Sequence, residues 1–279
     1  MAIDARAVPA LGILAQVLAE DGRDFVLIGA TVPQVLVHLL EGGEFRGRPT
    51  LDVDAVVTAV SWGDFEGMRR RLFDVGFRPG SASHQLLFDE DVMIDLVPYG
   101  PGLVENDRLV WPDTGFVMST LGFGEALARA EHVEVAPGLS VRVVSIPGLV
   151  LLKTVAYQDR PEERARDLIH VVYSFEHYEG EIEGSRRFEL AELTVAGQPV
   201  EFEEAGAYLL GTEVARLAMP KSLVAVRRFL EMLTDEYARP IAQILREEGR
   251  IVNNETRGRQ LLRLFGVFAA GLEEGSRTA

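Results

Sequence analysis

A pair of acids within an otherwise apolar segment, LDVDAVV from Leu51 to Val57, constrains the fold of this 279-residue chain most strongly. Apolar residues alternate there with Asp52 and Asp54, which is typical of a β-strand. Side chains two residues apart lie on one face of a strand, so we expect the two carboxylates to lie side by side. Adjacent like charges repel, and a cation between them relieves the repulsion. All-oxygen ligands favour Mg²⁺ or Mn²⁺, although this pair alone also fits a strand face open to water.

The residues before this segment predict a strand, a glycine turn and a helix. Asp24 to Gly29 (DFVLIG) reads as a short buried strand that stops at Gly29-Ala30. Thr31 can cap the helix that follows, whose apolar residues recur at helical spacing as far as Leu40. A glycine turn allows backbone amides to approach a phosphate closely.

A third acid lies in a later apolar strand. His84 to Phe88 and Val92 to Val97 predict an antiparallel pair, with Asp95 inside the second strand and Pro98 breaking the pattern after it. If these strands are neighbours in one sheet, Asp52, Asp54 and Asp95 converge at one edge. Carboxylates around divalent ions suit in-line displacement at the α-phosphate of a nucleotide.

The remainder of the chain reads as mostly helical. Lys153 is the only basic residue of the helix expected from Ser145 to Gln158, and Asp167 lies on the next helix, Glu162 to Tyr178. We therefore expect an α/β fold, with a mixed sheet flanked by helices in residues 1–180 and a mostly helical region in residues 181–279. Four helices are expected in that second region: Glu203 to Leu217, Lys221 to Leu233, Tyr237 to Glu248 and Glu255 to Leu272.

Composition and missing motifs exclude several classes of function. The chain has no cysteine, which rules out disulfides and thiol chemistry, and its formal charge of −15 disfavours non-specific nucleic-acid binding. The five histidines lack H-E-x-x-H spacing, and neither a G-x-S-x-G elbow nor a P-loop is present. No apolar run approaches the ~18 residues needed to span a bilayer, and no signal peptide is recognisable, so we expect a cytoplasmic protein without a membrane anchor.

The order of these features resembles the nucleotidyltransferase superfamily that includes DNA polymerase β, and within it the bacterial AbiEii-type and related small nucleotidyltransferases. Five segments carry the resemblance, which spans residues 24–178: FVLIGA (Phe25 to Ala30), RPTLDVD (Arg48 to Asp54), GF (Gly76-Phe77), VMIDLVP (Val92 to Pro98) and KTVAYQDRPEERARDL (Lys153 to Leu168).

The resemblance implies roles for particular residues. Asp52, Asp54 and Asp95 would bind Mg²⁺ or Mn²⁺, and Asp95 would also help to deprotonate the acceptor. Gly29, Ala30 and Thr31 would line the triphosphate of a nucleoside triphosphate. Lys153 would contact its phosphates, with Asp167 in a supporting role. Two positions depart from the family pattern: Ala30 stands where glycine or serine is usual, and His170 stands where a second aspartate is usual.

The expected activity is therefore transfer of a nucleoside monophosphate from a triphosphate to a hydroxyl. The AbiEii resemblance implies the toxin of a toxin–antitoxin pair, with RNA or a protein side chain as acceptor and a cognate antitoxin as partner. A small-molecule acceptor, as in antibiotic-modifying relatives, is an alternative that suits the acidic composition. A non-catalytic module that binds nucleotide or a partner protein is a further alternative, favoured by Ala30.

Overall fold

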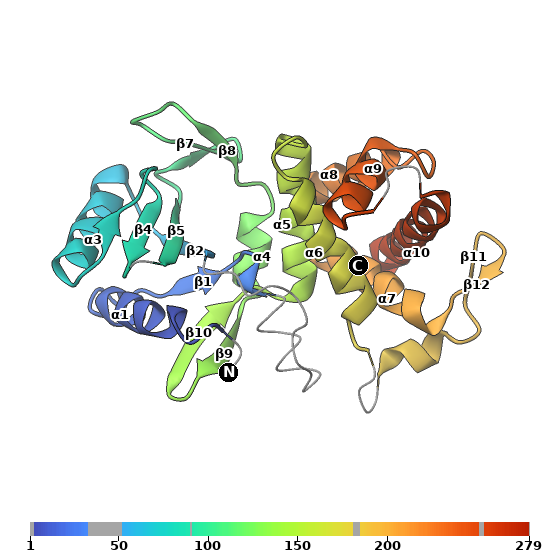
Figure 1. The fold of residues 1–279 in the computed structure, drawn as a ribbon, viewed down its shortest axis with the longest axis horizontal. Helices are drawn as coiled ribbons and strands as arrows, with labels where there is room; N and C mark the ends of the chain where they lie inside the picture. The colour runs from blue at the N-terminus through green and yellow to red at the C-terminus, as the bar shows by residue number, and fades with distance from the viewer. Residues whose placement is uncertain (1–2, 33–51, 90, 181–184, 251–253, 279) are drawn as a thin grey trace. The chain divides into compact units, whose positions relative to one another are not determined.

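The computed structural model describes residues 3–32, 52–89, 91–180, 185–250 and 254–278 (Figure 1). The chain forms two compact units, one comprising Met1–Thr120 and Arg129–Ser145, the other Leu121–Ala128 and Ile146–Ala279. Apart from its first two residues, the helix expected from Thr31 to Leu40 lies outside the described residues, as does the segment Arg48 to Leu51. The boundary expected after residue 180 differs from the division between these units, and as a domain boundary it stays a prediction.

A seven-stranded mixed sheet forms the centre of the first unit. Its strands lie in the order β3 (Arg78–Pro79), β4 (Gln85–Phe88), β5 (Val92–Tyr99), β2 (Asp52–Thr58), β1 (Phe25–Leu27), β10 (Leu139–Val143) and β9 (Glu131–Ala136). The pairs β2–β5 and β1–β10 are parallel, and the remaining pairs are antiparallel. The strands that carry the three acids are therefore neighbours, which meets the condition for Asp52, Asp54 and Asp95 to converge at one edge.

Alternation along β2 decides which residues enter the core. Val53, Ala55 and Val57 are fully buried on one face of the strand, whereas Asp52 and Thr58 are exposed. The helices α1 (Ala7–Ala19) and α3 (Trp62–Asp74) pack against each other beside the sheet (Figure 1). Each helix has its own apolar stripe, so burial of both stripes stabilises this unit.

Strand β5 extends beyond its expected end. Pro98 was expected to break the strand, but β5 continues through it to Tyr99. The Leu96 N–H donates to the carbonyl of His84, the residue just before β4. Backbone N–H groups two residues apart point to the same side of a strand, so an N–H on residue 98 would point beyond the end of β4. Pro98 therefore removes no ladder hydrogen bond to β4.

Several short strands were not predicted. A small antiparallel sheet contains β6 (Val104–Glu105), β7 (Arg108–Val110) and β8 (Val117–Ser119), and β9 pairs with the expected strand at residues 139–143. Strands of two or three residues are too short to show a period of two. The pattern of the sequence therefore could not mark β6, β7 and β8. Strand β9 has six residues, with Val133 and Val135 alternating with Glu134, and was missed in spite of that pattern.

The second unit is helical, as expected for the end of the chain, and it also contains the two helices that carry Lys153 and Asp167. Its elements are α4 (Phe123–Ala128), α5 (Ile146–Asp159), α6 (Ala165–His177), the 3₁₀ helix η1 (Arg186–Leu190), the hairpin β11–β12 (Thr194–Val195, Gln198–Pro199), α7 (Phe202–Leu217), α8 (Pro220–Glu231), α9 (Arg239–Glu247) and α10 (Glu255–Thr278). The predicted mixed α/β fold with a mostly helical C-terminal region is confirmed.

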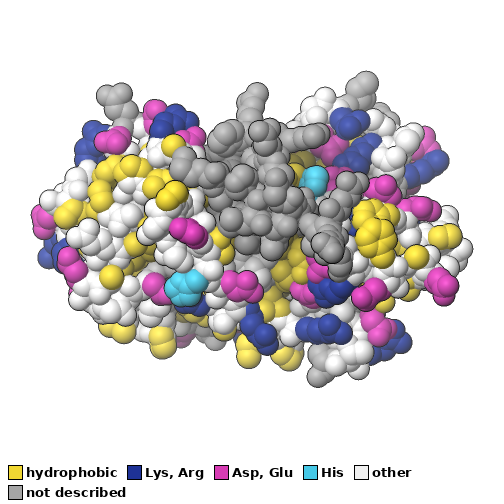
Figure 2. Space-filling view, turned by 90° about the horizontal axis from the view of Figure 1, so that it is seen from below, with side chains coloured by type: hydrophobic (Ala, Val, Ile, Leu, Met, Phe, Trp, Pro, Cys, Tyr) yellow, Lys and Arg dark blue, Asp and Glu magenta, His cyan; other side chains and the backbone are white. Residues whose placement is uncertain are grey.

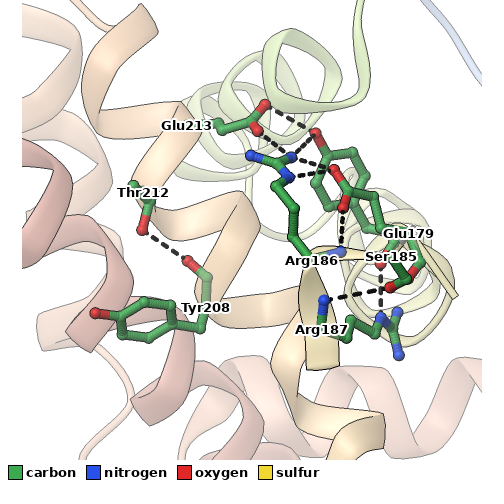
Figure 3. A network of polar contacts seen from close by, with 8 residues as sticks. Glu179, Ser185, Arg186, Arg187, Tyr208, Thr212 and Glu213 are labelled. Atoms are coloured by element: carbon green, nitrogen blue, oxygen red, sulfur yellow. Dashed lines mark hydrogen bonds and ion pairs between the residues drawn. The ribbon is translucent and has the colours of Figure 1, made fainter. Parts of the chain in front are cut away.

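Arginines of η1 hold the end of α6 in place (Figure 3). Arg186 bridges Glu179 and Glu213, and the hydroxyl of Tyr178 donates to Glu213 at 2.8 Å. Buried Arg187 donates to the carbonyl of Tyr178 at 2.8 Å and to two carbonyls in the last turn of α6. These bonds satisfy carbonyls that have no partner within the helix itself.

Charge is mixed on the surface. On the face drawn in Figure 2, acidic and basic side chains of the described residues are interspersed. Elsewhere in the structure such side chains form ion pairs, for example Arg227–Glu273 at 3.0 Å. No helix within the described part of the chain combines the length and apolar character needed to cross a membrane.

Candidate active site

The register of β2 and β5 places two carboxylates beside each other. Asp54 and Asp95 are Cα partners in this parallel pair, so their side chains emerge on the same face of the sheet. Asp52 lies one side-chain repeat away on that face and pairs with Met93. Asp52 is exposed, whereas Asp54 and Asp95 are half-buried. The structure thus brings the expected acids to one face, with Asp54 and Asp95 as immediate neighbours.

Gly29 lies against the side chain of Asp54. The Ile28 N–H donates to the Asp54 carbonyl at 3.0 Å, which fixes the chain beside β2 just before the turn. A Cβ added to Gly29 would overlap the Asp54 carboxylate. Only glycine therefore allows the turn and the carboxylate to occupy this space together.

Thr31 does not cap a helix in the expected way. It is fully buried in the first turn of the helix, and its Oγ1 has no hydrogen-bond partner within the described part of the chain. The turn is closed instead by the Val32 N–H, which donates to the Gly29 carbonyl at 3.0 Å. Ala30 lies between them, half-buried. Gly29, Ala30 and Thr31 thus form one tight turn beside Asp54.

The chemistry of these donors fits Mg²⁺ or Mn²⁺. Among the residues that the structure describes, no group of three or more histidine, aspartate or glutamate side chains is arranged to hold a metal ion. Mg²⁺ usually binds one or two carboxylates and completes its shell with water and substrate phosphates. The neighbouring carboxylates of Asp54 and Asp95 match that smaller requirement, and the Gly29 turn leaves room for them.

His84, which belongs to no metal-binding motif in the sequence, adjoins the acidic pair. His84 Nε2 lies 3.9 Å from Asp95 Oδ2, and both side chains are 26% exposed. The imidazole packs on Trp111, with ring centroids 5.2 Å apart. H-E-x-x-H spacing tests for two histidines on one helix, so it cannot detect a histidine that a hairpin brings beside an acid. The antiparallel pair expected from His84 to Phe88 and Val92 to Val97 is the sequence signal, and its register in the structure, with Gln85 opposite Asp95, places His84 there.

Lys153 and Asp167 form an ion pair in the second unit. Lys153 Nζ lies 2.6 Å from Asp167 Oδ1, and the two side chains are 11% and 8% exposed. Arg164 adds a longer contact to Asp167 at 3.9 Å. The pair links α5 to α6, so each charge is largely compensated by the other inside the unit.

His170 lies close to this pair on α6. Burial, together with the positive charge of Lys153, lowers the pKa of His170 to about 4, against the opposing effect of Asp167. Its Nδ1 is buried and has no hydrogen-bond partner in the described part of the chain. His170 is therefore neutral near pH 7 in the folded protein.

The sequence matches no known protein-family profile and no curated protein. Among solved structures, the chain is similar to an antigenic nucleotidyltransferase-like protein from Paracoccidioides brasiliensis, with a TM-score of 0.36 and 17% sequence identity. The similarity covers 61% of this chain and 78% of that one.

Proposed function

We propose that this chain is a metal-dependent nucleotidyltransferase, which transfers a nucleoside monophosphate from a nucleoside triphosphate to a hydroxyl acceptor. The observation that carries the proposal is the register of β2 and β5, which makes Asp54 and Asp95 neighbours. The Gly29 turn against Asp54 supports it, because a phosphate-binding turn and a metal-binding carboxylate must lie close together in such a reaction.

The carboxylates have separate tasks in this reaction. Asp54 and Asp95 would hold Mg²⁺ or Mn²⁺, and Asp52, to which only the sequence resemblance assigns a role as a third ligand, lies on the same face. The ion neutralises charge on the transferring phosphate and on the leaving group. Asp95 would also accept the hydroxyl proton as the acceptor oxygen bonds to the α-phosphorus. The bond from that phosphorus to the bridging oxygen breaks, and pyrophosphate leaves.

The triphosphate would be held by backbone and side-chain donors. The turn at Gly29 and Ala30 would offer amide groups, and the Thr31 hydroxyl, which has no hydrogen-bond partner among the described residues, would be a further donor beside them. The sequence resemblance alone assigns Lys153 to contact phosphate, with Asp167 in a supporting role. Asp167 would then hold the ammonium group of Lys153 through their ion pair.

The acceptor defines the biological role. The resemblance to AbiEii-type proteins supports a cytoplasmic toxin that modifies RNA or a protein side chain and is opposed by a cognate antitoxin. The formal charge of −15 favours a neutral or cationic small molecule instead, because it repels a phosphate backbone. Ala30, which stands where the family usually has glycine or serine, favours a module that binds nucleotide or protein without turnover.

An incorporation assay tests the proposal. Purified protein, Mn²⁺ or Mg²⁺ and each α-labelled triphosphate are incubated separately with total RNA, cell protein and a pool of aminoglycosides. We expect label on one acceptor class, reduced at least 100-fold in Asp54→Asn and in Asp95→Asn, since each loses a metal ligand. Asp113→Asn is the matched control, because Asp113 is an exposed acid in the same unit. Triphosphate binding without labelling of any acceptor would favour the non-catalytic module.

A further inference from the structure

We propose that His84 is a positioning residue that orients the carboxylate of Asp95 towards the metal ion. The inference rests on the proposed function, since it assigns a partner to one of the proposed metal ligands. Carboxylates and histidines that bind metals are usually held by a second layer of hydrogen-bonding groups, and loss of such a partner weakens metal binding by about 10–100-fold.

The backbone of His84 is fixed next to Asp95. Its carbonyl accepts a hydrogen bond at 2.8 Å from the N–H of Leu96, the residue directly after Asp95 in β5. The loop before it is closed by the Gln85 side chain, whose Oε1 accepts from the Ser81 hydroxyl at 2.8 Å and from the Ala82 N–H at 3.2 Å. The Gly80 N–H also donates to the Gln85 carbonyl at 3.0 Å. His84 thus projects from a hydrogen-bonded loop whose position is set by β4 and β5.

An aromatic cluster supports the imidazole ring. Trp111, which is only 2% exposed, contacts the His84 ring on one side. Trp111 is in turn held by Trp62, with ring centroids 5.1 Å apart, and by fully buried Phe65. Because the indole cannot move without disturbing this cluster, it limits the rotamers open to His84.

The direction of the ring fits a role on Asp95. In the sheet, Asp95 has Asp54 beside it on β2 and Gln85 on β4. A hydrogen bond from His84 to one oxygen of the Asp95 carboxylate would hold that group in place and leave its other oxygen for a metal ion shared with Asp54. Nε2 of His84 lies 3.9 Å from Oδ2, and a neutral imidazole protonated at Nε2 can donate to that oxygen. The separation exceeds a hydrogen bond, and contacts of this kind often tighten only when the site is loaded.

Mn²⁺ binding without nucleotide tests the inference separately from activity. The free Mn²⁺ signal in electron paramagnetic resonance gives the Kd for wild type, His84→Ala, His84→Gln and the Asp54→Asn, Asp95→Asn double variant. We expect His84→Ala to raise the Kd about 10–100-fold. His84→Gln, which keeps an N–H donor, should recover part of that loss. His132→Ala removes an exposed histidine of β9 and should leave the Kd unchanged. Thermal unfolding of every variant confirms that it is folded.

The outcomes separate the two claims. If wild type binds Mn²⁺ and the double variant does not, an unchanged Kd in His84→Ala would overturn the positioning role alone. A Kd for His84→Gln no better than that of His84→Ala would also overturn it, because packing rather than donation would then be the cause. If wild type binds no more Mn²⁺ than the double variant, the proposed metal site fails, and the role of His84 fails with it.

Discussion

The carboxylate of Asp54 occupies the space in which a Cβ on Gly29 would lie. This contact joins the turn after β1 to the acidic face of β2. A change at one of these residues must therefore displace the other, although twenty-four residues lie between them in the chain.

Substitution of Gly29 should disturb both stability and function. In Gly29→Ala the new methyl group must push away either the turn or Asp54, at a cost of about 1–3 kcal/mol in the free energy of unfolding. Mn²⁺ affinity and nucleotide incorporation should fall with it. Denaturant unfolding measures the first effect. Gly12→Ala is the control, because a Cβ there meets nothing within 4 Å and alanine favours the interior of helix α1. Equal stability of the two variants would contradict the close contact.

The backbones of α7 and α10 approach each other through glycines. A Cβ on Gly271 would overlap the carbonyl oxygen of Tyr208, and Thr212 Oγ1 donates to the Gly271 carbonyl at 3.2 Å. Figure 3 shows Thr212 and Tyr208 on α7. We expect Gly271→Ala to lower the free energy of unfolding by about 2 kcal/mol, as overpacking forces the helices apart.

Gly266 provides the control within the same helix, because an added Cβ there has open space. Gly266→Ala should be neutral or stabilise the protein by about 1 kcal/mol. Thermal unfolding of the two variants compares them directly. A loss of similar size in both would show that helix propensity, not the helix contact, decides the effect.

Removal of one partner from the ion pair of Lys153 and Asp167 should lower the free energy of unfolding. Asp167→Asn leaves the ammonium of Lys153, which is 11% exposed, without its nearest carboxylate. We expect destabilisation of about 3 kcal/mol by chemical denaturation, because a buried charge remains uncompensated. The double variant Lys153→Met, Asp167→Leu should lose much less than the sum of the two single losses. Additive losses would contradict a direct pair.

Acid sensitivity should depend on His170. Its pKa is about 4 in the folded state, against an ordinary value near 6.5 in the unfolded chain. Between these values the unfolded state binds the extra proton, so stability rises with pH by up to about 1.4 kcal/mol per pH unit from this group. The contribution of neutral His170 to the free energy of unfolding is complete above pH ~6.5 and is lost as the pH falls towards 4.

Comparison of His170→Gln with wild type isolates that contribution from the carboxylates, which are common to both proteins. The free energy of unfolding measured between pH 4 and pH 7 should have a smaller slope in the variant. Identical slopes would mean that His170 is accessible to protons in the folded state.

Periodicity in the sequence was enough to identify the acidic strands. Alternation around Asp52 and Asp54 predicted β2, and the isolated acid in VMIDLVP predicted the place of Asp95 in β5. The main helices also followed from apolar spacing and from breaks at glycine and proline. The register that pairs Asp54 with Asp95 was outside the reach of such patterns, because side-chain alternation does not identify a neighbouring strand.

Contacts between distant side chains were harder to predict. Lys153 and Asp167 lie on successive helices, and the packing of α5 on α6 brings Nζ to Oδ1. The His84 ring beside Asp95 packs on Trp111, which directly follows strand β7, and a strand of three residues is too short to predict. The arrangement around the site thus depends on tertiary packing that no local pattern encodes.

The pairing of Asp54 with Asp95 is the centre of the account, and anomalous diffraction tests it most directly. Crystals grown with Mn²⁺ and a non-hydrolysable triphosphate would be measured where manganese scatters anomalously. We expect a peak within about 2.1 Å of an oxygen of each carboxylate, with phosphate oxygens completing the shell. A bound triphosphate without a peak between Asp54 and Asp95, or a peak held by other residues, would contradict the proposed site.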